Sequence, residues 1–425
     1  ALQQSLKQGK RLNKNPIRFL NALYEQSISY HRVESGSGQQ RIGIIFQQMW
    51  ASPLYEEKRK DFYELLKALA QKKALALFED SQIVNGLCTL SQYKEKWMRP
   101  LAQWKPKSHN RDKQFRSLLR YLLAKYPVPY FMDEAFFRNV PKYIDWFIYI
   151  GQGGNMRKAP NLPLKMTKKM AHYFLQAPDH YQIPEALRYG QVLGMGGNER
   201  LLRAINGTNL GRSFENEDFW STVIQFFVNQ TPMDLSRINP IVDYIQQQKF
   251  NNRRVMRARG VIEDLAPPQP DFNMKGRSLN SLLRAVHQWH LDLRKQNKLF
   301  SGITWVASQV SDFIWMVHED QINQRTYEIR QLLTSDELAL EGNAQSHCVG
   351  SYVSDCVEGD CTIWSMTVED VFQGRRRAMT VELDNNNEIV QARAKYNSIP
   401  DEEALQVLTY WAVENDLKMS KWLND

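Results

Sequence analysis

Residues 361–397, CTIWSMTVEDVFQGRRRAMTVELDNNNEIVQARAKYN, contain three short runs in which apolar and polar side chains alternate. Such a period of two is typical of β-strands with one buried face. Asp384 to Asn387 provide the asparagine-rich chemistry of a tight turn between the last two runs. The short links predict an antiparallel β-meander of three sequential strands, and YEIRQLL at 327–333 is expected to be a further short strand. The three runs are CTIWSMTV (361–368), RRRAMTVEL (375–383) and NEIVQARAK (387–395).

Helical periodicity flanks these strands. Residues 277–295, RSLNSLLRAVHQWHLDLRK, place their apolar residues on one stripe, as an amphipathic helix requires. After the last strand, DEEALQVLTYWAVENDL at 401–417 predicts a closing helix, whose acidic start suits the helix dipole. We therefore expect the C-terminal part to be an α+β domain. The stripe consists of Leu279, Leu282, Leu283, Val286, Trp289, His290 and Leu293.

The chain before residue 265 shows helical periodicity, in segments such as DFYELLKALAQKKALALF (61–78) and RSLLRYLLAKY (116–126). The segment APPQPDF at 266–272 cannot continue a helix, because three of its residues are prolines. We therefore expect a mainly α protein with three parts. They are a large, basic, all-helical multi-helix domain at 1–265, which a break near 127–160 could divide into two sub-bundles, a proline-rich connector at 266–272, and a smaller α+β domain at 273–425.

Composition excludes several classes of protein. Of the 425 residues, 43% are hydrophobic, which is sufficient for packed cores and argues against disorder. No segment approaches the ~18 consecutive apolar residues of a membrane span, and the first residues lack the apolar core of a signal peptide. Four cysteines are too few and too unevenly placed for a disulfide framework. We expect a cytoplasmic protein with no membrane partner.

The formal net charge is +9, and the basic residues gather in clusters. Clustered Lys and Arg neutralise phosphates and give a salt-dependent affinity for nucleic acid. We therefore expect nucleic acid or a nucleoprotein complex as the partner; a well-solvated basic surface is the alternative. The residues expected to contact nucleic acid are Arg157, Lys158, Lys168, Lys169, Arg253, Arg254 and Arg257, and further clusters run from Lys7 to Lys14, Lys105 to Arg120 and Arg375 to Arg377.

The segment EGNAQSHCVGSY, residues 341–352, sets His347 beside Cys348. We expect Glu341 and Gly342 to mark a loop that leads into a helix beginning near Cys348, with Tyr352 and Cys356 on the same face at i+4 and i+8. The positive end of the helix dipole lowers the pKa of a thiol in the first turn and favours the nucleophilic thiolate. Alternatively, Cys348 is a small buried residue at the start of a helix.

A thiol nucleophile needs a base within hydrogen-bond reach. His347 is adjacent in sequence, so we expect its side chain to point away from Cys348. His290 is the preferred base, because it lies on the stripe of the long amphipathic helix, and His287 and His318 are weaker choices. The alternative is that His290 is a core histidine whose partner is a backbone carbonyl. Whether the protein is a hydrolase or transferase, or no enzyme, stays open.

Four neighbouring residues carry side chains that can bind zinc, namely His347, Cys348, Cys356 and Cys361. Structural zinc sites usually use two closely spaced ligand pairs. An adjacent His-Cys pair followed by longer gaps matches no such pattern. We therefore expect no metal centre and no cofactor, with zinc bound by these four residues as the alternative.

Polar residues alternate with apolar ones in the last two predicted strands. Thr380 and Glu382 do so in one strand, and Gln391 and Arg393 in the next. If these faces coincide, Glu382 and Arg393 could pair across the hairpin, or could line a cleft together with Asn397, facing the expected helix. The alternative is an exposed sheet face with an ordinary cross-strand ion pair.

The order of these residues resembles the C-terminal core of the PcfJ-like family, in which E-G, H-C-V-G-x-Y, T-x-E-L and Q-x-R-x-x-N recur in this order. The resemblance covers about residues 325–415, and the helical segments upstream are also similar to family members. Cys356 and Cys361 lie outside the motif, and Ala394 and Lys395 replace a common glycine and polar residue. The motif falls on Glu341, Gly342, His347, Cys348, Val349, Gly350, Tyr352, Gly359, Thr380, Glu382, Gln391, Arg393 and Asn397.

The resemblance implies a bacterial protein of conjugative plasmids, other mobile elements or phage-defence systems, in a family whose biochemical activity is unassigned. Our preferred hypothesis is a protein that binds nucleic acid or a nucleoprotein partner and holds a polar pocket in its C-terminal domain. The alternatives are a Cys/His-type enzyme with Cys348 as nucleophile, and a non-catalytic helical adaptor module. The expected pocket residues are His347, Cys348, Tyr352, Glu382, Arg393 and Asn397.

Overall fold

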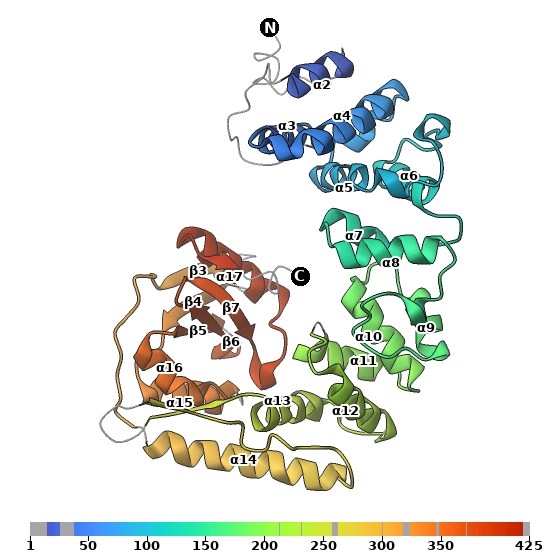
Figure 1. The fold of residues 1–425 in the computed structure, drawn as a ribbon. Helices are drawn as coiled ribbons and strands as arrows, with labels where there is room; N and C mark the ends of the chain where they lie inside the picture. Colours follow the sequence, from blue (N-terminus) through green and yellow to red (C-terminus); the bar gives the residue numbers. More distant parts are fainter. Residues whose placement is uncertain are drawn as a thin grey trace. The chain divides into compact units, whose positions relative to one another are not determined.

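The computed structural model describes residues 15–25, 38–211, 213–230, 232–256, 262–299, 301–317, 324–345, 348–370 and 372–419 (Figure 1). The chain divides into two compact units, 1–196 and 197–425. Among the described residues, no helix has the length and apolar character needed to cross a membrane.

The first unit is an array of short helices, as the periodicity predicts. They are α2 (Pro16–Tyr24), α3 (Gly38–Trp50), α4 (Glu56–Gln71), α5 (Ser81–Ser91), α6 (Arg111–Leu123), α7 (Glu134–Phe137), α8 (Pro141–Gly151), α9 (Lys168–Leu175) and α10 (Ile183–Gly194). In α4, Phe62, Leu66 and Leu69 are buried on one stripe. Asp80 caps α5, because its carboxylate accepts hydrogen bonds from two backbone N–H groups of the first turn.

Short 3₁₀ helices connect the helices of this unit. They are η1 (Pro53–Tyr55), η2 (Leu75–Phe78), η3 (Lys94–Lys96), η4 (Leu101–Gln103), η5 (Tyr130–Asp133) and η6 (Met156–Lys158). Much of the interval 127–160, where the sequence predicts a break between sub-bundles, is occupied by η5, α7, α8 and η6. The division into two sub-bundles stays a prediction.

The second unit begins with α11 (Glu199–Asn206), α12 (Glu217–Asn229) and α13 (Ile238–Lys249), with η7 (Asn209–Gly211) and η8 (Leu235–Arg237) between them. A short antiparallel hairpin then pairs β1 (Arg253–Met256) with β2 (Ile262–Leu265). The sequence predicts helix throughout this stretch, so the hairpin corrects that prediction. Val255 of β1 and Ile262 of β2 are β-branched residues, which favour the extended conformation, and this accounts for the difference.

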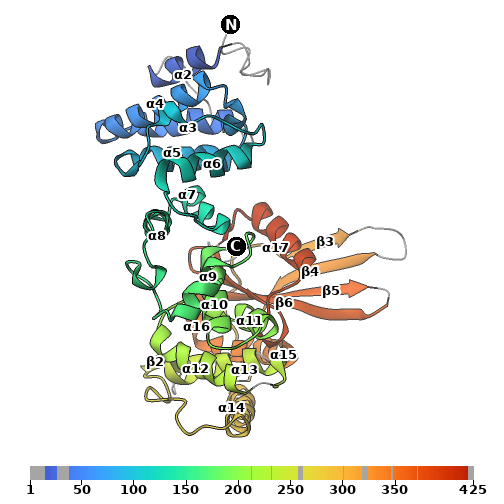
Figure 2. The ribbon, with the colours of Figure 1, turned by 90° about the vertical axis from the view of Figure 1, so that its right-hand side faces the viewer.

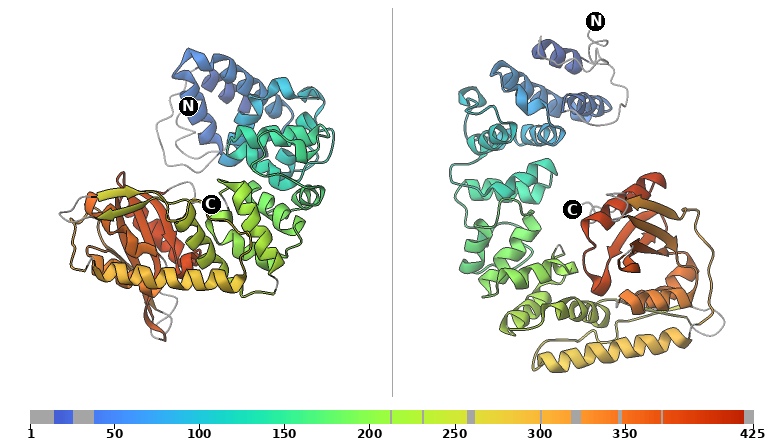
Figure 3. Two further views of the ribbon diagram at one scale, coloured as in Figure 1. Left: turned by 60° about the horizontal axis from the view of Figure 1, so that its bottom comes forward. Right: turned by 180° about the vertical axis from the view of Figure 1, so that it is seen from behind.

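The proline-rich segment 266–272 contains no helix or strand and leads to α14 (Leu279–Leu299), a single long helix drawn in yellow in Figure 3. On α14, Leu282 and Val286 of the predicted stripe are buried. The connector and α14 lie within the second compact unit. The separation of the chain into domains at 1–265 and 273–425 stays a prediction.

The second unit also contains a six-stranded sheet, in the order β3-β4-β5-β6-β7-β8, of which Figure 2 labels β3 to β6. Neighbouring strands are antiparallel, except that β7 and β8 pair parallel. The predicted three-stranded meander is confirmed as β5 to β7. The short strand predicted at 327–333 corresponds to β4, which pairs with β5, while β3 and β8 are additions at the two edges of the sheet. The strands are β3 (Phe313–Val317), β4 (Arg325–Gln331), β5 (Cys361–Asp370), β6 (Gly374–Asp384), β7 (Glu388–Arg393) and β8 (Lys418–Met419). The predicted fold class, mainly α with a smaller α+β part, is therefore confirmed.

Helices cover both faces of this sheet (Figure 1). They are α15 (Ser335–Gln345), η10 (Cys348–Tyr352), α16 (Val353–Glu358) and α17 (Glu402–Glu414), and η11 (Lys395–Asn397) follows β7. On one face, Leu408 and Trp411 of α17 pack in a core with Trp364 of β5. On the other, Val349 of η10 packs in a smaller core with Ile363 of β5, together with residues of α15 and α16. Alternate residues of β5 to β7 therefore face η10.

The region around Cys348 differs from the prediction in two details. Glu341 and Gly342 lie inside α15 and not in a loop. The chain from Cys348 to Tyr352 forms the 3₁₀ helix η10 before α16 begins. A 3₁₀ helix has about three residues per turn, so the i, i+4 relation expected of an α-helix does not hold there. Gly359 ends α16 with a φ of 79°, in the left-handed region that glycine tolerates.

Candidate functional site

A polar cavity of about 120 Å³ lies within the second unit, between η7 and α13 on one side and the sheet with η10 on the other. The sheet side contributes Tyr352, Ile363, Thr380, Glu382, Gln391 and Arg393, and Asn397 follows from η11. The helical side contributes Asn209, Asn239, Asp243, Gln246, Gln247 and Asn251. Two segments about a hundred residues or more apart in sequence thus build one cavity.

Two cross-strand rows make the sheet side of the cavity. Thr380 of β6 stands opposite Arg393 of β7, and Glu382 stands opposite Gln391. Because side chains of a strand alternate between its faces, this register puts the four residues on one face, which the sequence leaves open. Glu382 and Arg393 are therefore diagonal neighbours.

Arg393 also connects the two sides of the cavity. Its Nη2 donates a hydrogen bond to Oδ1 of Asn209 at 2.9 Å, which joins β7 to η7. Tyr352, Glu382, Arg393 and Asn397 thus line one cavity, which α13 borders as well as η10, and their role as a functional site stays a prediction.

Glu382 has an unusual electrostatic environment. Burial raises the pKa of its carboxyl group to about 7, and the charges of Asp355 and Asp384 act in the same direction. The hydrogen bond with Tyr352 opposes this effect, because it stabilises the carboxylate. Glu382 can therefore accept or release a proton near neutral pH, the behaviour required of a general acid or base.

The α13 side of the cavity is a stripe of amides and one carboxylate. Asn239, Asp243 and Gln246 recur at helical spacing, and Gln246 Nε2 donates to Asn251 Oδ1 at 2.9 Å. None of these residues is among the site residues predicted from the sequence. The signal was present, because the stripe follows the period of the helix and consists of polar side chains, but nothing local indicates that it faces a distant strand.

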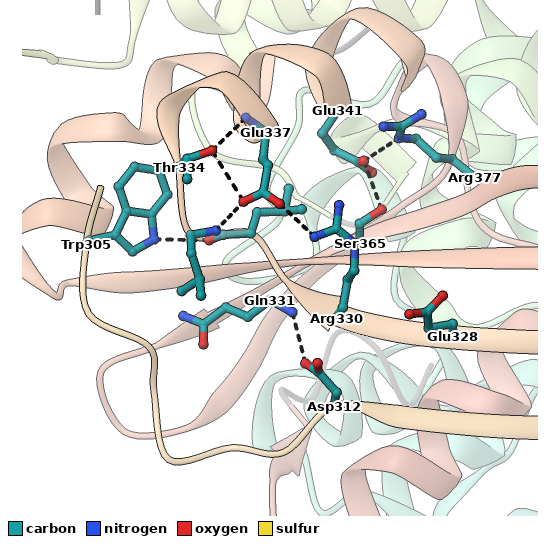
Figure 4. A network of polar contacts seen from close by, with 12 residues as sticks. Trp305, Asp312, Glu328, Arg330, Gln331, Thr334, Glu337, Glu341, Ser365 and Arg377 are labelled. Atoms are coloured by element: carbon teal, nitrogen blue, oxygen red, sulfur yellow. Dashed lines mark hydrogen bonds and ion pairs between the residues drawn. The ribbon is translucent and has the colours of Figure 1, made fainter. Parts of the chain in front are cut away.

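Glu341 of α15 connects this helix to the sheet, as its contacts with Ser365 and Arg377 show (Figure 4). Its side chain is 0% exposed and accepts hydrogen bonds from Ser365 Oγ at 2.8 Å and Thr380 Oγ1 at 2.7 Å. Arg377 Nε donates to the same carboxylate at 2.5 Å. Since Thr380 also lines the cavity, Glu341 positions one residue of the site without lining it.

The structure describes only some of the residues that were predicted as the nucleophile and its base. His347 lies outside the described residues, and so does the side chain of Cys348, whose backbone begins η10. His290 lies half-buried on α14, with its ring 4.7 Å from that of Trp289, and is not among the residues that line the cavity. The pairing of Cys348 with a histidine base therefore stays a prediction.

Cys356 and Cys361 are neighbours in the small core beneath η10, and both are buried free thiols. Their hydrogen bond raises the pKa of Cys361, and burial raises it further. Within the described part of the chain, no group of three or more His, Cys, Asp or Glu side chains is placed to hold a metal ion. His347 and the Cys348 side chain, the other two zinc candidates, lie outside that part.

One predicted basic cluster is neutralised by its surroundings. Arg375 pairs with Glu328, Arg376 pairs with Asp370, and Arg377 pairs with Glu341. Each arginine of this run thus has a carboxylate partner within the sheet unit. Contacts of this kind reduce the charge available to phosphates.

The residues expected to bind nucleic acid are distributed over both units. Lys158 of η6 is exposed and Arg157 is half-buried, while Lys168 and Lys169 are exposed in the first turn of α9, which contacts η6. Arg253 is exposed on β1, two residues after Asn251 of the cavity. Arg257 and the side chain of Arg254 lie outside the described residues. Nucleic-acid contact by these residues stays a prediction.

A protein-family model, described as PcfJ-like protein, matches residues 283–408. The match includes η10, β5 to β7 and the sheet side of the cavity, while η7 and α13 precede it. Searches of curated proteins and of solved structures found no match. Residues 283–408 of this chain are therefore a PcfJ-like family domain.

Proposed function

We propose that this protein binds single-stranded nucleic acid and that the cavity of the second unit receives one nucleobase. The observation that carries the proposal is the composition of the cavity wall. Amide side chains from α13, η7, β7 and η11 surround the space, together with the Tyr352 hydroxyl group. Such groups offer both donors and acceptors, as the edges of bases do.

The charges of the wall favour a neutral group over a polyphosphate. Arg393 is the one cationic side chain among the lining residues, and Asp243 and Glu382 are carboxyl groups. Two carboxylates would repel several phosphates, whereas a base forms hydrogen bonds with carboxylates and amides alike. Val242, Val349 and Ile363 add apolar surface for the face of a ring.

A single strand is the expected form of the nucleic acid. A base can enter a cavity only when it is unstacked, and this costs least in a strand that is not paired. Arg393 and the exposed Arg253 are positively charged groups that could contact the adjoining phosphates. Binding of nucleic acid also agrees with the mobile-element or phage-defence setting that the family resemblance implies.

The test is fluorescence anisotropy of the full chain with labelled single-stranded DNA and RNA of about 12 nucleotides at low salt. Arg393→Gln should weaken binding roughly tenfold, because a charge-assisted hydrogen bond contributes about 1.5 kcal/mol or more. Arg375→Gln is the matched control, since it removes the same charge from an exposed arginine of the same sheet. The proposal is refuted if neither the DNA nor the RNA oligonucleotide binds, or if Arg375→Gln weakens binding as much as Arg393→Gln does.

A further inference from the structure

The first unit contains a second and larger cavity, of about 530 Å³, among α3, α4, α5 and the end of α7. Asn85, Cys88, Thr89 and Gln92 line it from one stripe of α5 and its C-terminal end, at the spacing of successive helical turns. α3 contributes Arg41, Ile45, Gln48 and Met49 in the same way. A volume of this size lies in the range of small-molecule sites.

The charges that line this cavity are all positive. Arg41, Lys58 and Arg138 are among the lining residues, and no Asp or Glu is. Arg138 has a partner, because its Nε lies 2.8 Å from Glu134. For Arg41 and Lys58, no ion pair with a carboxylate is present among the residues that the structure describes. Two cations thus face the cavity without a described counter-charge.

Arg41 is also held in place. Its Nε donates to Asn85 Oδ1 at 2.6 Å, across from α3 to α5. This bond engages one of the five N–H donors of the guanidinium group. A guanidinium fixed in this way is oriented to bind two oxygens of an anion before the anion arrives.

We propose that this cavity binds a phosphate group, with Arg41 and Lys58 as its counter-charges. Arginine forms paired hydrogen bonds to phosphate oxygens, and lysine adds a point charge. The amide groups of Gln48, Asn85 and Gln92 provide further donors. The phosphate belongs either to a nucleic-acid backbone or to a small phosphorylated molecule, which the experiment separates.

Cys88 provides a reporter within the same cavity. Its thiol is half-buried, and burial raises its pKa to about 11, while Arg41 and Lys58 lower it. An anion bound to those two cations would cover the thiol and disfavour its thiolate, which is the reactive form. Occupancy can therefore be read from the rate at which N-ethylmaleimide modifies Cys88, as measured by peptide mass spectrometry.

The experiment uses the full chain at constant ionic strength, with acetate, inorganic phosphate, adenosine monophosphate or a single-stranded oligonucleotide as the probe. At least one phosphate-bearing probe should slow modification of Cys88 by about threefold or more relative to acetate. Protection by the oligonucleotide alone identifies nucleic acid as the source, and protection by the small probes identifies a small ligand.

Arg41→Gln and Lys58→Gln, made singly, should each reduce this protection. Lys60→Gln, an exposed lysine of α4 outside the cavity lining, should not. Lys58 is exposed, so its replacement leaves the helical core intact. Equal rates with acetate and all phosphate-bearing probes, or full protection in both variants, would overturn the inference. Inorganic phosphate carries no base, and the lining of this cavity shares no residue with the cavity of the second unit, so protection by inorganic phosphate is an outcome separate from the base-binding proposal.

Discussion

Replacing Glu341 with alanine should destabilise the second unit by about 3 kcal/mol. The change removes the acceptor of two buried hydroxyl groups, those of Ser365 and Thr380, and an unsatisfied buried group costs about 1 kcal/mol or more. It also removes the partner of Arg377. That side chain is 35% exposed, so water screens its charge, and its share is about 1 kcal/mol and not the 3–5 kcal/mol of a fully buried pair.

Hydrogen exchange of peptides from β5 and β6, measured by mass spectrometry, reports the local loss of stability. Thermal unfolding reports the loss of stability of the whole protein. Glu328→Ala is the matched control. Glu328 pairs with Arg375, which lies in β6 as Arg377 does but is more exposed. This substitution should cost less than about 1 kcal/mol. A loss in Glu341→Ala no larger than in this control would refute the reasoning from burial.

Three further outcomes are expected. Glu382→Gln should flatten the dependence of stability on pH between 4.5 and about 7. Burial raises the pKa of the Glu382 carboxyl group from 4.5 to about 7, so the folded state binds this proton more tightly than the unfolded state does. The stability of the wild-type protein therefore falls as pH rises through this window. Melting temperatures at about pH 5 and about pH 8 measure this, and an unchanged slope would contradict it. Gly359→Ala should cost about 1 kcal/mol in urea unfolding because φ is 79°, and Gly359→Asn should cost less; equal costs would count against the left-handed cap. If Cys348 is a catalytic thiolate, iodoacetamide at neutral pH should label it much faster than Cys88, whose pKa burial raises to about 11. Equal, slow labelling would eliminate the Cys/His enzyme alternative.

The strands of the second unit could be predicted because their signal is local. In β6 and β7 the apolar residues alternate with Thr380, Glu382, Gln391 and Arg393, and alternation in sequence becomes a shared face in the sheet. The turn at Asn387, with a φ of 57°, follows from the same local chemistry. One face of the cavity was therefore accessible from the sequence.

The other face was not accessible, because it depends on contacts between distant segments. Nothing in the stripe of Asn239, Asp243 and Gln246 indicates that α13 lies across from β7. The sequence predicts a loop at Glu341, yet this residue lies in α15 and accepts a buried hydrogen bond from Ser365 of the sheet, a distant contact that no local pattern indicates. The two-residue strand β8 is too short for any periodicity.

The cavity of the second unit has a divided origin, since the PcfJ-like domain supplies the sheet side and the preceding helix α13 supplies the opposite side. Substitutions on α13 can change the size and hydrogen-bonding pattern of the space while the sheet and the Glu341 anchor stay as they are. The residues of α13 that could select a ligand therefore lie on a different segment from the sheet residues that maintain the fold. Chimaeras that exchange only residues 238–251 would show how far changes in α13 alter which ligands bind beside the PcfJ-like domain.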